Sequence, residues 1–275
     1  MSLLELLEDQ DDVDAVYMNH GKRQRFVATS LLLSFGFVFV VYSNFEQSLI
    51  PIILLTLATL LLFVWSLKDG LGKNATLLTL ILPMMFTLGV GLFWFLLPTT
   101  IWARLPIIFL YGFGLYSLCL TSNIFTVSAV RTIALVRSAK SVGFVLTLFT
   151  SFLLFDAVIS VKNGPIIPFF IVFLLSFLLY LPNLWVTKLD ATLEKKMVTH
   201  SATLAFLTAS IYLFLFFWPV TVVIGSIFLT VSIYVILGLA QSYWDGHLFS
   251  ATIREYLVVG IIVFIAMIIA TNWRG

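Results

Sequence analysis

The chain has 275 residues, of which 61% are hydrophobic and only 10% carry a charge, and its formal net charge is +2. Soluble domains have about 25% charged residues, so this composition excludes a protein whose whole surface faces water and indicates one that faces lipid. The single cysteine, Cys119, excludes an intrachain disulfide and a metal site built from several cysteines.

The first 25 residues predict an acidic cytoplasmic tail. Glu5, Glu8 and Asp9 are followed closely by further acids, and no Lys or Arg precedes Lys22. A secretory signal peptide begins with positive charges, so this segment does not fit one. Two interpretations remain open: a solvated tail, or a docking segment for a cytosolic partner within residues 1–19.

Nine apolar runs follow, and each is close to the 20 residues that a helix needs to cross a bilayer. They occupy residues 26–42, 49–67, 76–97, 106–122, 142–161, 166–186, 201–218, 220–240 and 256–272. These runs predict one all-α, polytopic membrane domain over residues 26–275. Pro219 separates the seventh run from the eighth and breaks a helix, so we expect a hairpin there.

The basic residues predict the orientation of these spans. Of the 15 Lys and Arg residues, Arg104, Lys162 and Arg274 fall on one side of the predicted membrane, and the other 12 fall on the side of the N-terminus. Short cytoplasmic loops are enriched in Lys and Arg. We therefore expect a multi-pass protein of the cell membrane with its N-terminus inside and its C-terminus outside.

An internal repeat is a further hypothesis. Residues 34–51 align with residues 151–168, and Ser34, Phe35 and Pro51 are among the positions that are identical in both. The same offset carries the third and fourth spans onto the seventh and eighth. This favours two parallel groups of four helices followed by a ninth helix. Such repeats occur in transporters, with substrate sites at the repeat interface, and they also arise when a scaffold is duplicated.

Asp156 is the only acid within a predicted span, and it lies near the outer end of the fifth. Ser160 and Asn163 follow it at helical spacing, so the three side chains predict a polar stripe that reaches the outer surface. Arg104, at the outer start of the fourth span, is a candidate ion partner, and Tyr42 and Asn44 at the outer end of the first span are the other candidate partners. Three roles remain open for Asp156: a polar clamp between helices, a proton- or cation-binding site in a transport path, and a protonated acid that faces lipid.

A basic segment, T-S-N-I-F-T-V-S-A-V-R-T-I-A-L-V-R-S-A-K-S, occupies residues 121–141. Arg131, Arg137 and Lys140 are candidate contacts for anionic lipid, and the alternative is a helical extension that packs on its neighbours. This segment and the closing run R-E-Y-L-V-V-G-I-I-V-F, residues 254–264, resemble segments of an uncharacterised family of multi-span bacterial membrane proteins. The resemblance implies a location in the bacterial inner membrane and no particular activity.

Catalytic motifs are absent from the sequence, which contains no G-x-S-x-G and no glycine loop for phosphate. His200, Asp245 and His247 are conceivable metal ligands, but they lack the helical spacing of known zinc motifs, so we expect no metal and no cofactor. The sequence favours a non-enzymatic membrane-embedded subunit or scaffold. The main alternative is a transporter or flippase for apolar or lipid-like substrates, and an intramembrane enzyme is third. Membrane lipids are expected partners, and nucleic acid is not.

Overall fold

The computed structural model describes residues 20–42, 49–68, 70–71, 74–98, 100–129, 135–161, 164–190 and 192–271. Within these ranges the regular secondary structure is entirely helical. The elements are α2 (His20–Tyr42), α3 (Ile50–Leu67), the 3-10 helix η1 (Asn74–Leu80), α4 (Ile81–Trp94), α5 (Ile101–Ser128), α6 (Val136–Ser160), α7 (Ile166–Lys188), α8 (Lys195–Phe216), α9 (Val222–Trp244) and α10 (Ser250–Ala270).

The nine predicted spans are confirmed as helices, because the described residues contain nine helical segments that are long and apolar enough to cross a membrane. The third of them joins η1 to α4. The hairpin at Pro219 is also confirmed, since α8 ends at Phe216 and α9 begins at Val222. Several helices begin before their apolar runs, as α8 does at Lys195. Helical hydrogen bonds form between backbone groups, so a helix can include polar residues that flank its apolar run. The structure is consistent with a multi-pass membrane protein.

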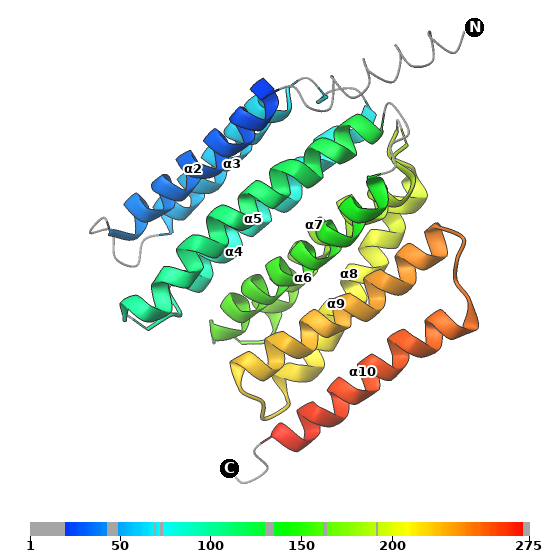
Figure 1. Cartoon of the computed structure of the whole chain (residues 1–275). Helices are drawn as coiled ribbons and strands as arrows, with labels where there is room; N and C mark the ends of the chain where they lie inside the picture. Colours follow the sequence, from blue (N-terminus) through cyan, green and yellow to red (C-terminus); the bar gives the residue numbers. More distant parts are fainter. Residues whose placement is uncertain are drawn as a thin grey trace, which may run out of the picture.

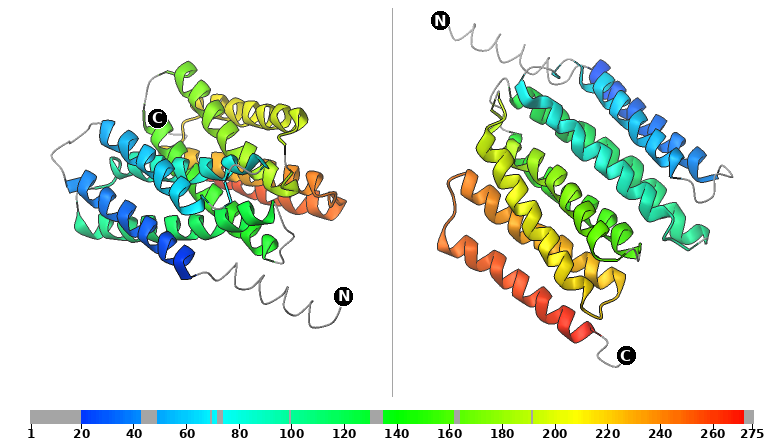
Figure 2. Two further views of the ribbon diagram at one scale, coloured as in Figure 1. Left: turned by 90° about the horizontal axis from the view of Figure 1, so that it is seen from above. Right: turned by 180° about the vertical axis from the view of Figure 1, so that it is seen from behind.

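The helices run up and down in two adjoining groups (Figures 1 and 2). In the first group, α2 packs against α3 and α5, and α4 packs against the same two helices. In the second group, α6 and α8 each pack against α7 and α9. Contacts of α6 with α4 and α5 join the two groups, and α10 lies at the edge of the bundle against α9.

Small residues and aromatic rings allow these helices to approach closely, as is common in membrane bundles. The ring of Phe86 on α4 lies against Gly114 of α5 and stacks on the Tyr111 ring, with 5.9 Å between centroids. At the edge of the bundle, the ring of Tyr256 on α10 fits against Gly238 of α9. A side chain at either glycine would occupy the space of the ring, so both positions help to set the distance between neighbouring helices.

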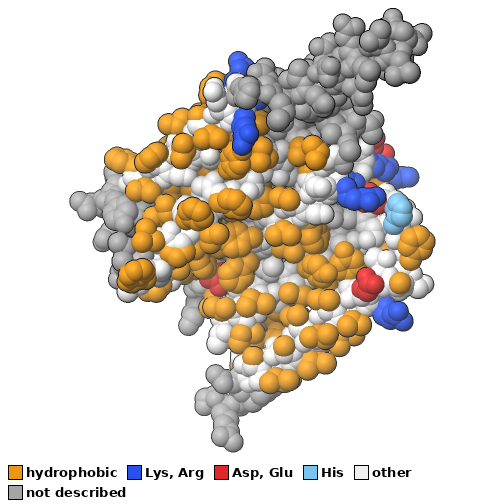
Figure 3. Space-filling view, in the orientation of Figure 1, with side chains coloured by type: hydrophobic (Ala, Val, Ile, Leu, Met, Phe, Trp, Pro, Cys, Tyr) orange, Lys and Arg blue, Asp and Glu red, His pale blue; other side chains and the backbone are white. Residues whose placement is uncertain are grey.

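The two ends of the bundle differ in charge. We call the end at which α2, α6, α8 and α10 begin the basic end, and the other the opposite end. Among the described residues, every Lys and Arg except Arg104 lies near the basic end. Figure 3 shows most of the visible charged side chains gathered along one margin of the molecule, while apolar side chains cover the flank between the ends. This distribution suits a bundle whose flank faces lipid.

Candidate functional site

Asp156 is buried between α6 and α9 near the opposite end. Only 4% of the residue is exposed, and all the residues from Leu153 to Val158 are buried. The Asp156 Oδ1 atom accepts a hydrogen bond of 3.0 Å from Ser226 Oγ on α9. Ser160 lies one turn further along α6, where its Oγ donates to the Asp156 backbone carbonyl at 2.7 Å. The carboxyl group of Asp156 therefore links two helices through a hydroxyl group.

The expected ion pair between Asp156 and Arg104 does not form. The Arg104 guanidinium lies over the Trp94 ring, 4.9 Å from its centroid, on the side of α4 and α5. Asp156 instead faces α9, because the rotation of α6 in the bundle, which sequence spacing does not reveal, directs it there. Asn163, the third member of the predicted polar stripe, lies outside the described residues, so the stripe is described only as far as Ser160.

Lys140 and Arg137, the two basic residues of this segment that the structure describes, have different surroundings. Lys140 ties helices together, since its Nζ donates to the Thr187 carbonyl at 3.1 Å and lies 3.2 Å from Asp245 Oδ1 in an ion pair. Those contacts join the start of α6 to the last turn of α7 and to the turn after α9. Arg137 is exposed, and contact with anionic lipid remains a prediction for it. Arg131 lies outside the described residues.

The three conceivable metal ligands make separate contacts. The His200 ring packs against the Trp244 ring, with 5.4 Å between centroids. His247 Nδ1 lies 2.6 Å from the backbone carbonyl of Asp245, and the Asp245 carboxylate pairs with Lys140. Within the described part of the chain, no group of three His, Cys, Asp or Glu residues could hold a metal ion. Each of the three side chains therefore has its own contact at the surface of the basic end.

Asn183 forms a polar junction that the sequence analysis did not select. Its Nδ2 donates to Thr147 Oγ1 on α6 at 2.9 Å and to the Leu179 carbonyl of its own helix at 2.8 Å. Gln241 Nε2 of α9 donates to the Asn183 backbone carbonyl at 3.2 Å. The junction therefore connects α6, α7 and α9. An amide directly after Pro182 within an apolar run is the signal that could have identified it.

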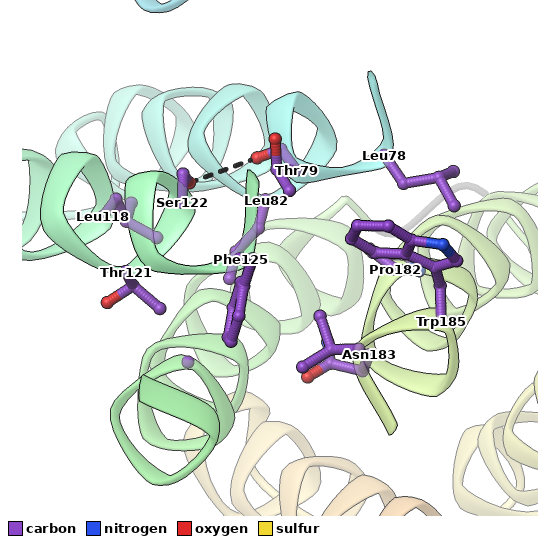
Figure 4. A pocket seen from close by; sticks show the side chains of 12 residues that line it. Leu78, Thr79, Leu82, Leu118, Thr121, Ser122, Phe125, Pro182, Asn183 and Trp185 are labelled. Atoms are coloured by element: carbon purple, nitrogen blue, oxygen red, sulfur yellow. Dashed lines mark hydrogen bonds between the residues drawn. The ribbon is translucent and has the colours of Figure 1, made fainter. Parts of the chain in front are cut away.

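Asn183 also lines a cavity of about 30 Å³ where the two groups of helices meet (Figure 4). The other polar side chains around it are Thr79, Thr121 and Ser122, and Ser122 Oγ donates to the Thr79 carbonyl at 3.4 Å. Phe125 and Trp185 are among the apolar side chains of its wall. This volume can hold a water molecule but not a solute of many atoms. It is a small, mostly apolar void with a few polar side chains in its wall.

Comparison with known proteins identifies a family and no activity. No curated protein and no solved structure is similar enough to the chain to count as a match. The family model described as "Protein of unknown function (DUF5656)" matches residues 35–270, a range that contains Arg104, Asp156 and Asn183. The match covers most of the chain and agrees with the resemblance seen in the sequence. The chain belongs to the DUF5656 family of proteins of unknown function.

Proposed function

We propose that this protein is a non-enzymatic membrane-embedded subunit or scaffold, with its basic end and N-terminus on the cytoplasmic side and its C-terminus outside. The observation that carries the proposal is the environment of Asp156. An acid in a transport path has to be reached by water or substrate. Asp156 is instead enclosed by buried neighbours and hydrogen-bonded to Ser226. Its position suits a clamp between helices.

Contacts at the basic end connect the helices of the second group. Lys140 pairs with Asp245, and Lys188 pairs with Glu194 at 3.2 Å while its Nζ lies 4.7 Å from the centre of the Trp244 ring. These interactions connect the ends of α6, α7, α8 and α9. Carriers that alternate between two access states move one group of helices against another. The contacts named here all lie within the second group, α6–α9, so they hold that group together as one body.

The partners that we propose are membrane lipids and a cytosolic protein. Arg137, Lys195 and Lys196 are exposed at the basic end, where anionic headgroups or an acidic protein surface would meet them. Residues 1–19, the proposed docking segment for the cytosolic partner, lie outside the described residues. We propose no contact with nucleic acid.

Reconstitution of the Asp156→Asn variant tests the scaffold role. Purified wild type and variant are placed in liposomes, and proton leak and the scrambling of fluorescent lipid are compared with those of protein-free liposomes. We expect a lower unfolding temperature for the variant, because a neutral amide oxygen accepts a weaker hydrogen bond from Ser226 than a carboxylate does, and we expect protein-free flux for both. If the wild type raises the flux above that of protein-free liposomes and the variant does not, the result would favour a transporter.

A transporter or flippase for apolar or lipid-like substrates is the second candidate, and an internal repeat favours it. The two groups, α2–α5 and α6–α9, share the same order of neighbours, and in each the second helix also packs against the fourth. Buried residues 117 positions apart correspond, as in Thr59 and Ser176, Phe63 and Tyr180, and Ser66 and Asn183. We infer a duplication followed by a ninth helix. The cavity beside Asn183 lies between the two groups, where such transporters bind substrate, but at about 30 Å³ it is too small for a lipid-like molecule.

A further inference from the structure

Arg104 is a cation without an ion pair or a hydrogen bond among the described residues. It lies in the first turn of α5 at the opposite end of the bundle. Its Nε atom is buried and makes no hydrogen bond, and the described residues offer it no ion pair. A guanidinium group has five N–H donors and stays charged, so leaving it unpaired beside lipid is costly. Its surroundings should therefore supply an anion.

The position of the guanidinium is fixed by an aromatic shelf. Trp94, over which it lies, is 5% exposed and packs edge-on against Phe37, with 5.5 Å between ring centroids. Phe37 in turn packs on Tyr111 at 4.8 Å. These residues belong to α4, α2 and α5, so three helices hold the shelf in place. The guanidinium group is planar, and its N–H groups match the geometry of phosphate oxygens.

Neighbouring residues of α5 place this group at the boundary between lipid and water. Trp102 is 84% exposed, and Trp side chains prefer the headgroup level of a bilayer. Leu105 and Phe109, which follow Trp102 at helical spacing, are 50% and 76% exposed and make an apolar stripe along the flank. The backbone N–H groups in the first turn of α5 are further donors, because Thr100 makes no side-chain cap.

We infer that Arg104 binds the phosphate group of a membrane phospholipid at the opposite end of the bundle. The phosphate supplies the anion and meets the outer N–H groups of the guanidinium, since Nε is buried. The acyl chains of the same lipid lie along the stripe of Trp102, Leu105 and Phe109. The site recognises phosphate rather than a net negative headgroup, so phosphatidylethanolamine and phosphatidylglycerol both bind. It is separate from Asp156, which is already bonded to Ser226.

Native mass spectrometry of the purified full chain tests this site. The chain is titrated with phosphatidylglycerol, with diacylglycerol of the same acyl chains, and with inorganic phosphate. We expect the wild type to bind phosphatidylglycerol more tightly than diacylglycerol and to be unaffected by inorganic phosphate. Arg104→Gln should bind phosphatidylglycerol about tenfold more weakly, the scale of one lost charged hydrogen bond. Arg104→Lys should be intermediate, because it keeps the charge without the planar fork.

Arg254→Gln is the matched control, because it removes an exposed arginine from the basic end and should leave this preference unchanged. Equal phosphatidylglycerol binding by wild type and Arg104→Gln would overturn the inference. The same holds if the wild type does not distinguish phosphatidylglycerol from diacylglycerol, a comparison that needs no variant to fold. Displacement of the lipid by inorganic phosphate would show that the site takes free phosphate and would overturn the assignment to a headgroup.

Discussion

Many buried hydroxyl groups of this bundle bond to the backbone of their own helix. Thr56 donates to the Ile52 carbonyl, and Ser201 donates to the Met197 carbonyl, both one turn earlier. Such bonds satisfy the hydroxyl group without joining two helices. The bond from Ser226 to Asp156 is different because it crosses from α9 to α6. At the residue scale, cross-helix bonds of this kind are where a polar side chain can favour one arrangement of helices over another.

A double-mutant cycle measures the bond between Asp156 and Ser226. We expect Asp156→Ala and Ser226→Ala each to lower the free energy of unfolding, with a coupling energy of about 0.6–1.7 kcal/mol, as for other hydrogen bonds within membranes. Ser226 also lies 3.0 Å from the Val223 carbonyl, so its hydroxyl keeps an acceptor when Asp156 is removed. Reversible unfolding in mixed micelles gives the four free energies.

Ser232→Ala provides the control for this cycle. Ser232 is on the same helix as Ser226, but its hydroxyl donates to the Phe228 carbonyl of α9 itself. Combined with Asp156→Ala, it should show additive effects. A coupling between Asp156 and Ser226 no larger than that of the control would mean that the bond does not help to hold α6 and α9 together.

At the scale of the element, the spans could be predicted because hydrophobic length is a local property of the sequence. The positions of the nine helices followed from it, and so did the break at Pro219. The partner of Asp156 could not be predicted, because serine is common in these spans and the rotation of α9 against α6 depends on packing along both helices. Asn183 was missed for the same reason: its role depends on Thr147 and Gln241, which are distant in sequence.

Helix α7 allows a test of paired and unpaired polar groups on one element. Asn183→Ala removes the donor that reaches Thr147, and we expect it to lower the free energy of unfolding by about 1 kcal/mol. Ser176 lies two turns earlier, fully buried, and its hydroxyl has no hydrogen-bond partner among the described residues. Ser176→Ala should therefore be neutral or stabilising. Thermal unfolding of both variants checks this, and equal destabilisation would contradict it.

At the scale of the whole molecule, charge and packing divide the bundle in different directions. Packing divides it lengthwise into two groups of four helices, which meet where α6 contacts α4 and α5. Charge divides it across its length, since the described Lys and Arg residues other than Arg104 lie near one end. The lengthwise division concerns the origin of the two groups and their movement relative to each other. The second bears on orientation, which short basic loops set during insertion.

Cysteine labelling in cells tests the orientation. Cys119 is fully buried, so Cys119→Ala gives a cysteine-free background with little change at the surface. On that background, Thr221→Cys places a thiol in the exposed turn before α9 at the opposite end, and Lys196→Cys places one at the basic end. We expect a membrane-impermeant maleimide to label Thr221→Cys in intact cells and Lys196→Cys only after permeabilisation. Labelling of both after permeabilisation is the control for access. Because the two positions lie at different ends of the bundle, the reverse pattern would place the N-terminus outside and contradict the orientation that the basic residues predict.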